Sequence, residues 1–573
     1  MAVIRLGGFF GENRATTPMQ LGEGVGTVSR NQKPGRGDLR PWKSPTTVAT
    51  VPASRNTIYR MGRDVATPAT YWLSWTGTVH AVRTFDGDDT TERTVYTGDG
   101  APKVTDNITL DGTDPQDNPT AYRPLGIPAP AAALTVATDS GSWIGLSESF
   151  YYVYTYVNDW GWESAPSPVS AVNTRPADAT ATLSAFSAAP GGNYNITLKR
   201  IYRTQTGASG ATEFFFLREI AIGTASTVDD NRTLGDVLPT TAWIPAPGVP
   251  QGGAANFTEG NLSFLTALWN GMMAGISGNG LRFCEPYSPY AWPIGYEILP
   301  PDSKPVGIGV IGHQILVLTT GRPLLVAGSS PDSMDEMPVE MPQACVAPKS
   351  IVSMGSGVAW ASEDGLCWYG AGGPRLLTEG MMLREDWRAL VPSSVTGRLF
   401  EGLYFGSYDD GGGRKGFLID PSNPHGMYFL DTGYAVTHYD ELQDQLYVLS
   451  GQNVQKWDAG SAMSYTFKSK TFRMPKEINF ACAEVVASAY PVTLKVDAMS
   501  MAAEEVAAMV AKFPGICSAP VSTTLRTTLT VNGRGVFKLP AGFVALDWAL
   551  QLEGSNAVQG AAIATSVQEL AQT

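Results

Sequence analysis

Three glycines in this sequence have the spacing that a nucleotide-binding site uses. Gly307, Gly309 and Gly312 match the pattern G-x-G-x-x-G. That pattern binds a dinucleotide pyrophosphate only where it joins a strand to a helix, because the helix N-terminus must face the phosphates. The residues that follow, 314–318 (QILVL), are typical of a strand instead. We therefore interpret the glycines as part of a strand, and the sequence predicts no cofactor-binding residue.

Other groups of chemical interest are short and isolated. Residues 362–368 (SEDGLCW) resemble the Asp-box turn of sialidase-type propellers, S-x-D-x-G-x-T-W, but are one residue short and do not recur. The acidic runs 86–89 (DGDD) and 409–410 (DD) could supply the carboxylate pair of a glycosidase, and the first run could hold calcium. Both runs lie beside glycines, which favours solvated loop tips. The four histidines lack metal-ligand spacing. The sequence therefore predicts no catalytic residue, no metal site and no enzymatic activity.

Aromatic side chains give the more useful signal, because they could bind another protein. Residues 285–293 (EPYSPYAWP) form a proline-rich segment that would present Tyr287, Tyr290 and Trp292 on a stiff backbone. The same residues could instead fold back and cover the end of a sheet. Trp42, in the N-terminal segment, is a fourth candidate interface residue.

These residues must be positioned by strands, and a repeat shows where the strands lie. Segments that consist of an apolar run, a turn and a second apolar run begin at Trp269, Gly312 and Gly355, 43 residues apart, and again at Gln443. A longer hairpin at 401–420 fills the remaining register. Strand pairs that repeat every 40–50 residues are typical of β-propeller blades. We therefore expect an all-β chain built on a propeller.

Composition shifts divide the chain into five predicted parts. Residues 1–57 are expected to form an extended arm that is either disordered by itself or, as the apolar Leu39, Trp42 and Val48 favour, pinned across a neighbouring molecule. Residues 58–127 are expected to form the first blade or blades, with a hairpin around Thr76 and Gly77. Residues 128–242 are an inserted sandwich, 243–478 the main blades, and 479–573 a small closing β region. In the closing region, residues 499–512 (MSMAAEEVAAMVAK) predict one helix. The insert resembles a fibronectin type III or immunoglobulin-like domain in its YTYV, GWESAPS and RIYR segments.

Charge and cysteine content limit the partners. The 53 acidic and 40 basic residues give a formal net charge of −13, which disfavours a protein that grips a phosphate backbone but permits DNA to slide past. The five cysteines are scattered and odd in number, so we expect reduced, buried thiols. The first residues lack the apolar stretch of a secretory signal, and no apolar run is long enough for a membrane helix.

Several segments together resemble a known family. They are GDLRPW in the arm, YWLSW and TERTVYTGDG in the first blades, RIYRT in the insert, GNGLRFCEPYSPYAWP, and FKLPAGFVALDW and LEGSNAVQG near the end. This combination is similar to the tail nozzle, or tail tubular protein B, class of short-tailed bacteriophages. The 499–512 stretch fits that pattern least well.

The resemblance implies a structural virion protein, made in the host cytoplasm and placed in the phage tail. It implies a ring of identical subunits, a hexamer, below the head-to-tail adaptor and portal. Genomic DNA would pass through the ring during ejection, with acidic side chains along the channel. Tail fibres or spikes would attach outside, and contact with the host cell envelope would follow late. The alternatives are a peripheral receptor-binding or fibre-attachment tail protein, which would be trimeric with a repetitive shaft, and a propeller glycosidase.

Overall fold

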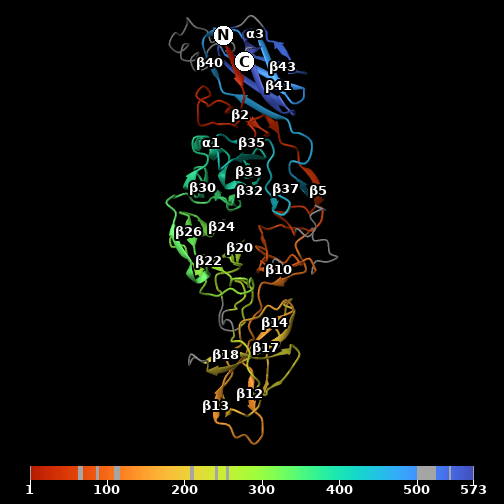
Figure 1. Cartoon of the computed structure of the whole chain (residues 1–573), viewed down its shortest axis with the longest axis vertical. Coiled ribbons are helices and arrows are strands. Elements are labelled where there is room, and N and C mark those ends of the chain that lie inside the picture. The colour runs from red at the N-terminus through yellow and green to blue at the C-terminus, as the bar shows by residue number, and fades with distance from the viewer. Residues whose placement is uncertain are drawn as a thin grey trace. The chain divides into compact units, whose positions relative to one another are not determined.

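The computed structural model is nearly all-β (Figure 1). It divides into two compact units. The structure describes residues 2–61, 69–85, 89–108, 117–206, 212–238, 243–252, 257–499, 524–540 and 544–571. Unit 1 comprises Met1–Thr50 and Gln343–Thr573, and unit 2 is Val51–Pro342. Unit 1 is therefore assembled from both ends of the chain, whereas unit 2 is continuous.

The repeats predicted from sequence are antiparallel hairpins, and all except the 401–420 hairpin lie at the middle of small four-stranded sheets. The 401–420 hairpin belongs to a ten-stranded sheet. Unit 2 contains three such sheets. They are β8 (His80–Arg83), β9 (Thr94–Thr97), β10 (Lys103–Thr105) and β11 (Arg123–Pro124); β20 (Ser263–Ala267), β21 (Met273–Ser277), β22 (Gly280–Phe283) and β23 (Glu297–Ile298); and β24 (Pro305–Ile311), β25 (Gln314–Thr319), β26 (Leu324–Ala327) and β27 (Asp335–Pro338), with a 3-10 turn η1 at Pro331–Ser333.

Unit 1 contains the remaining repeats. One sheet is β28 (Val352–Ser353), β29 (Gly357–Ala361), β30 (Leu366–Gly370) and β31 (Gly373–Leu376). The next four strands are β32 (Thr396–Phe400), β33 (Leu403–Asp409), β34 (Arg414–Ile419) and β35 (Tyr428–Leu430). The last group is β36 (Thr437–Asp440), β37 (Gln445–Ser450) and β38 (Asn453–Lys456). Short helical turns connect them: η2 (Pro348–Ser350), α1 (Arg384–Ala389) and η3 (Pro392–Ser394).

The N-terminal segment supplies strands to unit 1. Its strands are β1 (Val3–Leu6), β2 (Gly26–Arg30), β3 (Gln32–Lys33), β4 (Arg40–Pro41) and β5 (Thr46–Thr50). β5 pairs with β38 and so completes the β36–β38 group as a four-stranded sheet. β2 lies between β35 and β39 (Tyr465–Ser469). The sequence predicted an arm across a neighbouring molecule; the structure instead places this segment on its own chain, because its apolar side chains find partners there.

The closing region confirms the predicted strands around 523–552 and adds others. Its elements are β40 (Phe472–Ile478), β41 (Cys482–Ala487), β42 (Val492–Met499), β43 (Thr524–Val531), β44 (Val536–Lys538), β45 (Ala545–Gly554), β46 (Val558–Ala564) and α3 (Val567–Ala571). Met499 ends β42, and the rest of the predicted 499–512 helix lies outside the described residues. β42 alternates as a half-buried strand does: Val492, Leu494 and Val496 are buried, and Thr493 and Lys495 are not.

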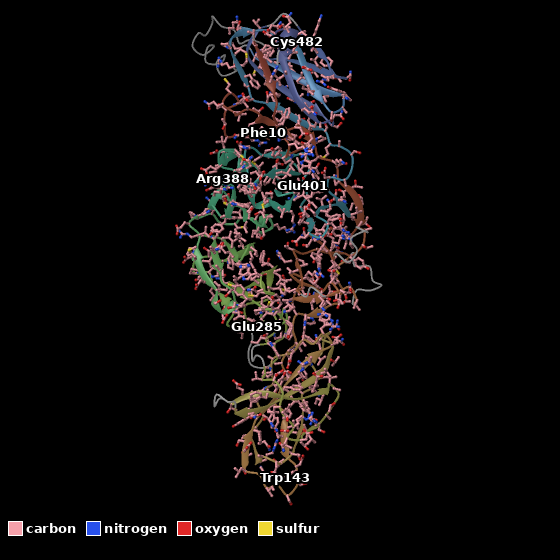
Figure 2. The ribbon with its side chains drawn as sticks, in the orientation of Figure 1. Phe10, Trp143, Glu285, Arg388, Glu401 and Cys482 are labelled. Carbon is pink, nitrogen blue, oxygen red and sulfur yellow. The ribbon has the colours of Figure 1, made fainter. Side chains whose placement is uncertain are left out.

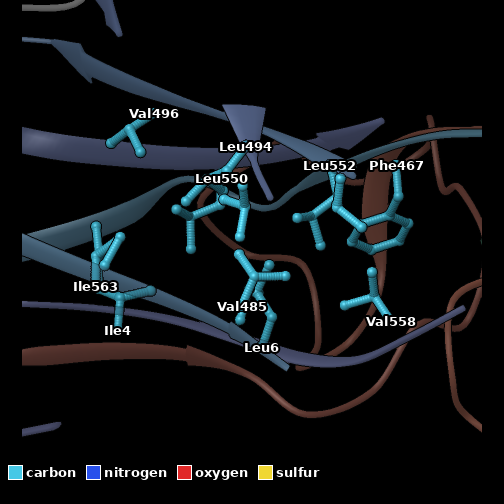
Figure 3. Close-up of a cluster of buried hydrophobic side chains, with 14 of the residues drawn as sticks. Ile4, Leu6, Phe467, Val485, Leu494, Val496, Leu550, Leu552, Val558 and Ile563 are labelled. Atoms are coloured by element: carbon cyan, nitrogen blue, oxygen red, sulfur yellow. The ribbon is translucent and has the colours of Figure 1, made fainter. Parts of the chain in front are cut away.

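The core of this region lies between two sheets. One sheet has the order β1-β46-β41-β44, and the facing strands β39, β45, β42 and β43 end the ten-stranded sheet that starts at β32. Apolar side chains from both sheets converge (Figure 3). The buried members labelled there are Ile4, Leu6, Phe467, Val485, Leu494, Val496, Leu550, Leu552, Val558 and Ile563. The N-terminal strand β1 is thus an integral part of a core whose other strands come from residues 465–564.

The insert in unit 2 consists of three small antiparallel sheets. These are β12 (Thr135–Thr138), β16 (Ala181–Ser184) and β19 (Thr227–Asp229); β13 (Ser147–Phe150) and β15 (Asn173–Pro176); and β14 (Tyr152–Asn158), β17 (Ile196–Thr206) and β18 (Thr212–Ala221). Alternate tyrosines of β14, Tyr152, Tyr154 and Tyr156, are buried in an apolar cluster that the insert shares with the neighbouring sheets of unit 2. The aromatic strand that the sequence predicted therefore forms part of a core.

One predicted hairpin is wrong. The sequence placed a hairpin at Thr76 and Gly77, but β7 (Trp72–Trp75) pairs with β6 (Thr57–Arg60), and β8 pairs with β9. The Thr57 hydroxyl donates to the Gly77 carbonyl at 2.9 Å and accepts from the Val79 amide at 3.0 Å. These bonds hold the turn against β6, so the chain passes from one sheet to the next.

Candidate interaction surface

The motifs with chemical spacing are structural. Gly307 and Gly309 lie in β24, which pairs with β25, and Gly312 occupies the turn between them with a φ of 53°. Residues 362–365 form the turn between β29 and β30. Hydrogen bonding from Gln343 and the nearby Arg384 charge lower the pKa of the Asp364 carboxyl in that turn. These placements confirm the interpretation of strand glycines and a hairpin tip.

The surroundings of the second acidic run and of three buried thiols are defined in the described part of the chain. Asp410 lies at the β33–β34 turn, where its carboxylate accepts from Lys415 at 2.8 Å and from the Gly412 amide at 3.0 Å. Residues 86–88 are outside the described residues. Among the described residues, no group of three or more His, Cys, Asp or Glu side chains is placed so that it could hold a metal ion. Burial raises the pKa of Cys284, Cys345 and Cys367 to about 12, so these thiols are neutral at pH 7.

The four candidate interface aromatics occupy different environments. Trp42 and Trp292 have no exposed surface. Trp42 packs in unit 1 against Phe400 and Trp457, and the Trp292 indole donates to the Pro289 carbonyl at 2.9 Å. Tyr287 is 71% exposed and has a left-handed φ of 58°.

Tyr290 connects the 285–293 loop to the insert within unit 2. Its ring stacks on Trp162 with centroids 5.1 Å apart and an interplanar angle of 20°. Burial raises the pKa of the Tyr290 hydroxyl. The loop thus holds one end of the insert. Of the four aromatics, Tyr287 alone remains largely available to another molecule.

A second exposed surface lies on the insert, in the loop of residues 139–146 between β12 and β13, which we call the tip loop. Ile144 is 95% exposed and Leu146 is 86% exposed, the two highest values among the large exposed apolar side chains of the described residues. Trp143, half-buried in the same loop, lies at the end of the insert in Figure 2. Exposed apolar side chains that adjoin one another indicate an interaction site more strongly than scattered ones do.

Hydrogen bonds fix the backbone of the tip loop. The Asp178 carboxylate accepts from the Ile144 amide at 3.0 Å and from the Gly145 amide at 2.8 Å, which lowers the pKa of Asp178. The Trp143 indole donates to the Asp139 carbonyl at 3.0 Å. The loop is therefore preorganised, so binding would order little additional chain.

The base of the tip loop is tied to the adjacent strand. The Asp139 carboxylate accepts from the hydroxyls of Thr182 and Thr180, each at 2.7 Å, and these bonds lower the pKa of Asp139. Residues 139–149 contain two acidic and no basic residues. The tip loop therefore suits an apolar pocket on a protein and lacks the cations that a nucleic acid or anionic membrane would require.

Comparisons with known proteins add little. No family model and no curated protein matches the chain. Among solved structures, apo AztD from Citrobacter koseri aligns over 56% of this chain and 79% of its own, with 11% identity and a TM-score of 0.25. The WD40 domain of Toxoplasma gondii coronin aligns over 60% and 74%, with 11% identity and a TM-score of 0.23. The Dos1 propeller aligns over 75% and 95%, with 10% identity and a TM-score of 0.25. Scores this low assign neither fold nor function.

Among the described residues, no helix is long and apolar enough to cross a membrane.

Proposed function

We propose that this chain is a structural subunit of a phage tail, of the nozzle or tail tubular protein B class. The observation that carries the proposal is the tip loop, a rigid loop that exposes Ile144 and Leu146. A scaffold needs such a stiff attachment point. The sequence resemblance to tail nozzle proteins suggests which partner would attach there, a tail fibre or spike.

In this proposal, five four-stranded sheets and the strands β32–β35 of the ten-stranded sheet are blades of a β-propeller. The five sheets are β8–β11, β20–β23, β24–β27, β28–β31, and β36–β38 with β5. The insert is a fibronectin type III-like sandwich. Six copies form a ring below the head-to-tail adaptor and portal. Genomic DNA passes through the ring, acidic residues line its channel, and the tip loop holds a tail fibre or spike. Contact with the host cell envelope follows attachment.

Cryo-electron microscopy of the particle tail tests this assignment. Six copies of the chain around an open axial channel would support it. Three copies at the periphery would favour the receptor-binding alternative, and absence from the particle would contradict a virion role altogether.

The attachment role of the tip loop gives a separate prediction. The double substitution Ile144→Ser and Leu146→Ser is expected to remove fibres or spikes from assembled particles, with affinity lowered at least about tenfold, because apolar anchors carry much of an interface's binding energy. Folding should be unaffected, since both side chains are exposed in the chain itself. Fibre occupancy counted by negative-stain electron microscopy, together with the melting temperature, measures both effects.

Leu442→Ser is a suitable control, because Leu442 is 61% exposed in the turn between β36 and β37, in unit 1. It should leave fibre occupancy unchanged. Equal occupancy in the double variant and wild type would contradict attachment through the tip loop.

A further inference from the structure

Tyr287 presents its ring on a fixed support. At 71% it is the most exposed of the large aromatic side chains in the described part of the chain. Its amide donates to the Gly271 carbonyl at 2.7 Å. A methyl group on Gly271 would lie 2.4, 2.7 and 2.8 Å from three atoms of the Tyr287 ring, so the ring packs directly on this glycine. One face of the ring is therefore seated on backbone, and the opposite face is turned to solvent.

The support itself is held by hydrogen bonds. Gly271 follows Asn270 in the turn between β20 and β21, and both residues have left-handed φ angles, 55° for Asn270 and 64° for Gly271. The Asn270 side-chain amide donates to the Ser329 carbonyl at 3.1 Å, which ties the turn to the loop that leads into η1. The ring of Tyr287 is thus preorganised, so a ligand that stacks on it would order little of the chain.

Two carboxylates lie beside this support. Glu285 precedes Tyr287 by two residues, and its Oε1 accepts from the Tyr296 hydroxyl at 3.2 Å (Figure 2). Asp332 lies in η1, in the loop that Asn270 holds against the turn. The pKa of the Tyr296 hydroxyl is raised, first by burial and then by the charges of Glu285 and Asp332. The exposed ring is therefore bordered by hydrogen-bond acceptors.

Both carboxylates keep acceptor capacity for a ligand. The Asp332 Oδ1 accepts from the Ser330 hydroxyl at 2.6 Å, and Glu285 accepts from Tyr296 through one oxygen. In the described part of the chain, neither carboxylate forms an ion pair. An ionised carboxylate has about four acceptor positions, so each can accept further hydroxyl donors.

A second aromatic side chain lies on the other side of the turn. Trp269, which is half-buried, directly precedes Asn270. Its ring packs against that of His313, from the β24–β25 turn, with centroids 5.4 Å apart. Aromatic rings therefore flank the Asn270–Gly271 turn on both sides.

The charge around Tyr287 restricts what can bind there. Residues 283–303 contain three acidic and no basic side chains, and residues 323–342 contain four acidic and no basic ones. A phosphate, a nucleic acid or a sulfated polymer would be repelled. An apolar protein anchor would have to desolvate the bordering carboxylates without supplying donors to them. A suitable ligand is uncharged, has one flat apolar face and carries hydroxyl groups around its edge.

We propose that Tyr287, together with Glu285 and Asp332, binds a neutral oligosaccharide whose rings have the gluco configuration. In such a pyranose ring the hydroxyls are equatorial, so the C–H bonds of each face point at whatever lies against it. These C–H groups carry partial positive charge and match the negative face of an aromatic ring. The equatorial hydroxyls point outward and can donate charge-assisted hydrogen bonds to the two carboxylates.

Calorimetry and saturation-transfer difference NMR with the purified full chain test this site. The probes are cellohexaose, chitohexaose and maltohexaose, which are neutral oligomers of glucose or N-acetylglucosamine. Wild type should bind at least one of them, and Tyr287→Ala should bind it at least about tenfold more weakly, because the stacking surface is lost. Tyr287→Phe keeps the ring and should bind within about twofold of wild type.

Glu285→Gln tests the contribution of the carboxylates. It should bind the same probe about fivefold more weakly, since a charge-assisted hydrogen bond becomes a neutral one. The melting temperatures of Tyr287→Ala and Tyr287→Phe should equal that of wild type, because the Tyr287 side chain is exposed. Saccharide binding by the isolated chain is measured without a ring or a particle, so its outcome is independent of the tail assignment.

Tyr151→Ala is the matched control. Tyr151 is a second exposed tyrosine of unit 2, at 39%, and lies in the insert between β13 and β14, so its loss should leave saccharide binding unchanged. A sulfated heparin hexasaccharide should not bind. Failure of wild type to bind any of the three neutral probes would overturn the proposal, as would undiminished binding by Tyr287→Ala, equal weakening in Tyr151→Ala, or binding of heparin in place of the neutral probes.

Discussion

Replacing Trp42 with alanine is expected to lower the free energy of unfolding of unit 1 by about 3–5 kcal/mol, the usual cost of truncating a buried tryptophan. Trp42 has no exposed surface, and its ring lies 6.1 Å from that of Phe400 and 5.8 Å from that of Trp457. The Lys33 ammonium lies 4.4 Å above the indole. The substitution would therefore leave a cavity where the N-terminal segment joins the β32–β38 strands.

Hydrogen–deuterium exchange measures this loss separately for each unit. Peptides from β33, β37 and β38 should exchange faster in Trp42→Ala, whereas peptides from unit 2 should exchange at the wild-type rate. Tyr287→Ala is the control, because Tyr287 is 71% exposed and its removal creates no cavity. Wild-type exchange in β37 and β38 would show that the N-terminal segment does not stabilise unit 1.

Neutralising Asp229 should destabilise the insert by about 3–5 kcal/mol, because breaking a buried ion pair leaves a buried charge without compensation. The Asp229 carboxylate is fully buried and accepts from Arg175 at 2.8 Å, from Arg203 at 2.7 Å and from the Tyr152 hydroxyl at 2.6 Å. In Asp229→Asn, the two guanidinium groups would face an amide. Peptides from β14 and β17 should then lose exchange protection.

The adjacent residue provides a matched control. Asp230 also pairs with two arginines, Arg218 and Arg232, but it is 46% exposed. Exposed ion pairs contribute little, so Asp230→Asn should change stability by less than about 1 kcal/mol. Equal effects of the two substitutions would show that burial of Asp229 does not determine its contribution.

Acidification should reproduce part of this effect. Burial alone would raise the pKa of Asp229, but the Tyr152 hydrogen bond and the charge of Arg203 hold it below its usual 3.8. Its contribution to stability is therefore complete above the usual value and is lost as the pH falls through the lower pKa of the folded state. An acid titration of exchange protection should be steeper for wild type than for Asp229→Asn.

The sequence predicted local elements well and long-range placement poorly. Each repeat is a continuous stretch of apolar runs around a turn, so the hairpins at 269–285, 312–328 and 443–459 follow from neighbouring residues. The fourth strand of the β36–β38 sheet could not be found in that way. It comes from Thr46–Thr50, which the sequence presents only as part of an irregular arm.

Which side chains are exposed also depends on contacts between residues that are distant in the sequence, and the sequence does not show these contacts. The sequence makes Trp42 and Trp292 candidate interface residues. It does not show that they are buried, because their burial depends on contacts with residues far away in the sequence. Ile144 and Leu146 lie in a run of serine and glycine that is typical of a loop. The backbone of that loop is held by Asp178, which is 34 residues from Ile144.

The pairing of β5 with β38 also sets an order of events at the ribosome. Thr47 and Gln455, whose side chains hydrogen-bond, are 408 residues apart. At about 5–20 residues per second, β5 waits about 20–80 s for its partner, while the continuous unit 2 can fold in the meantime. A prematurely terminated chain would therefore contain a folded unit 2 with an unpaired N-terminal segment. Unit 1 can therefore be completed only after the residues of β38 have been synthesised, long after those of β5.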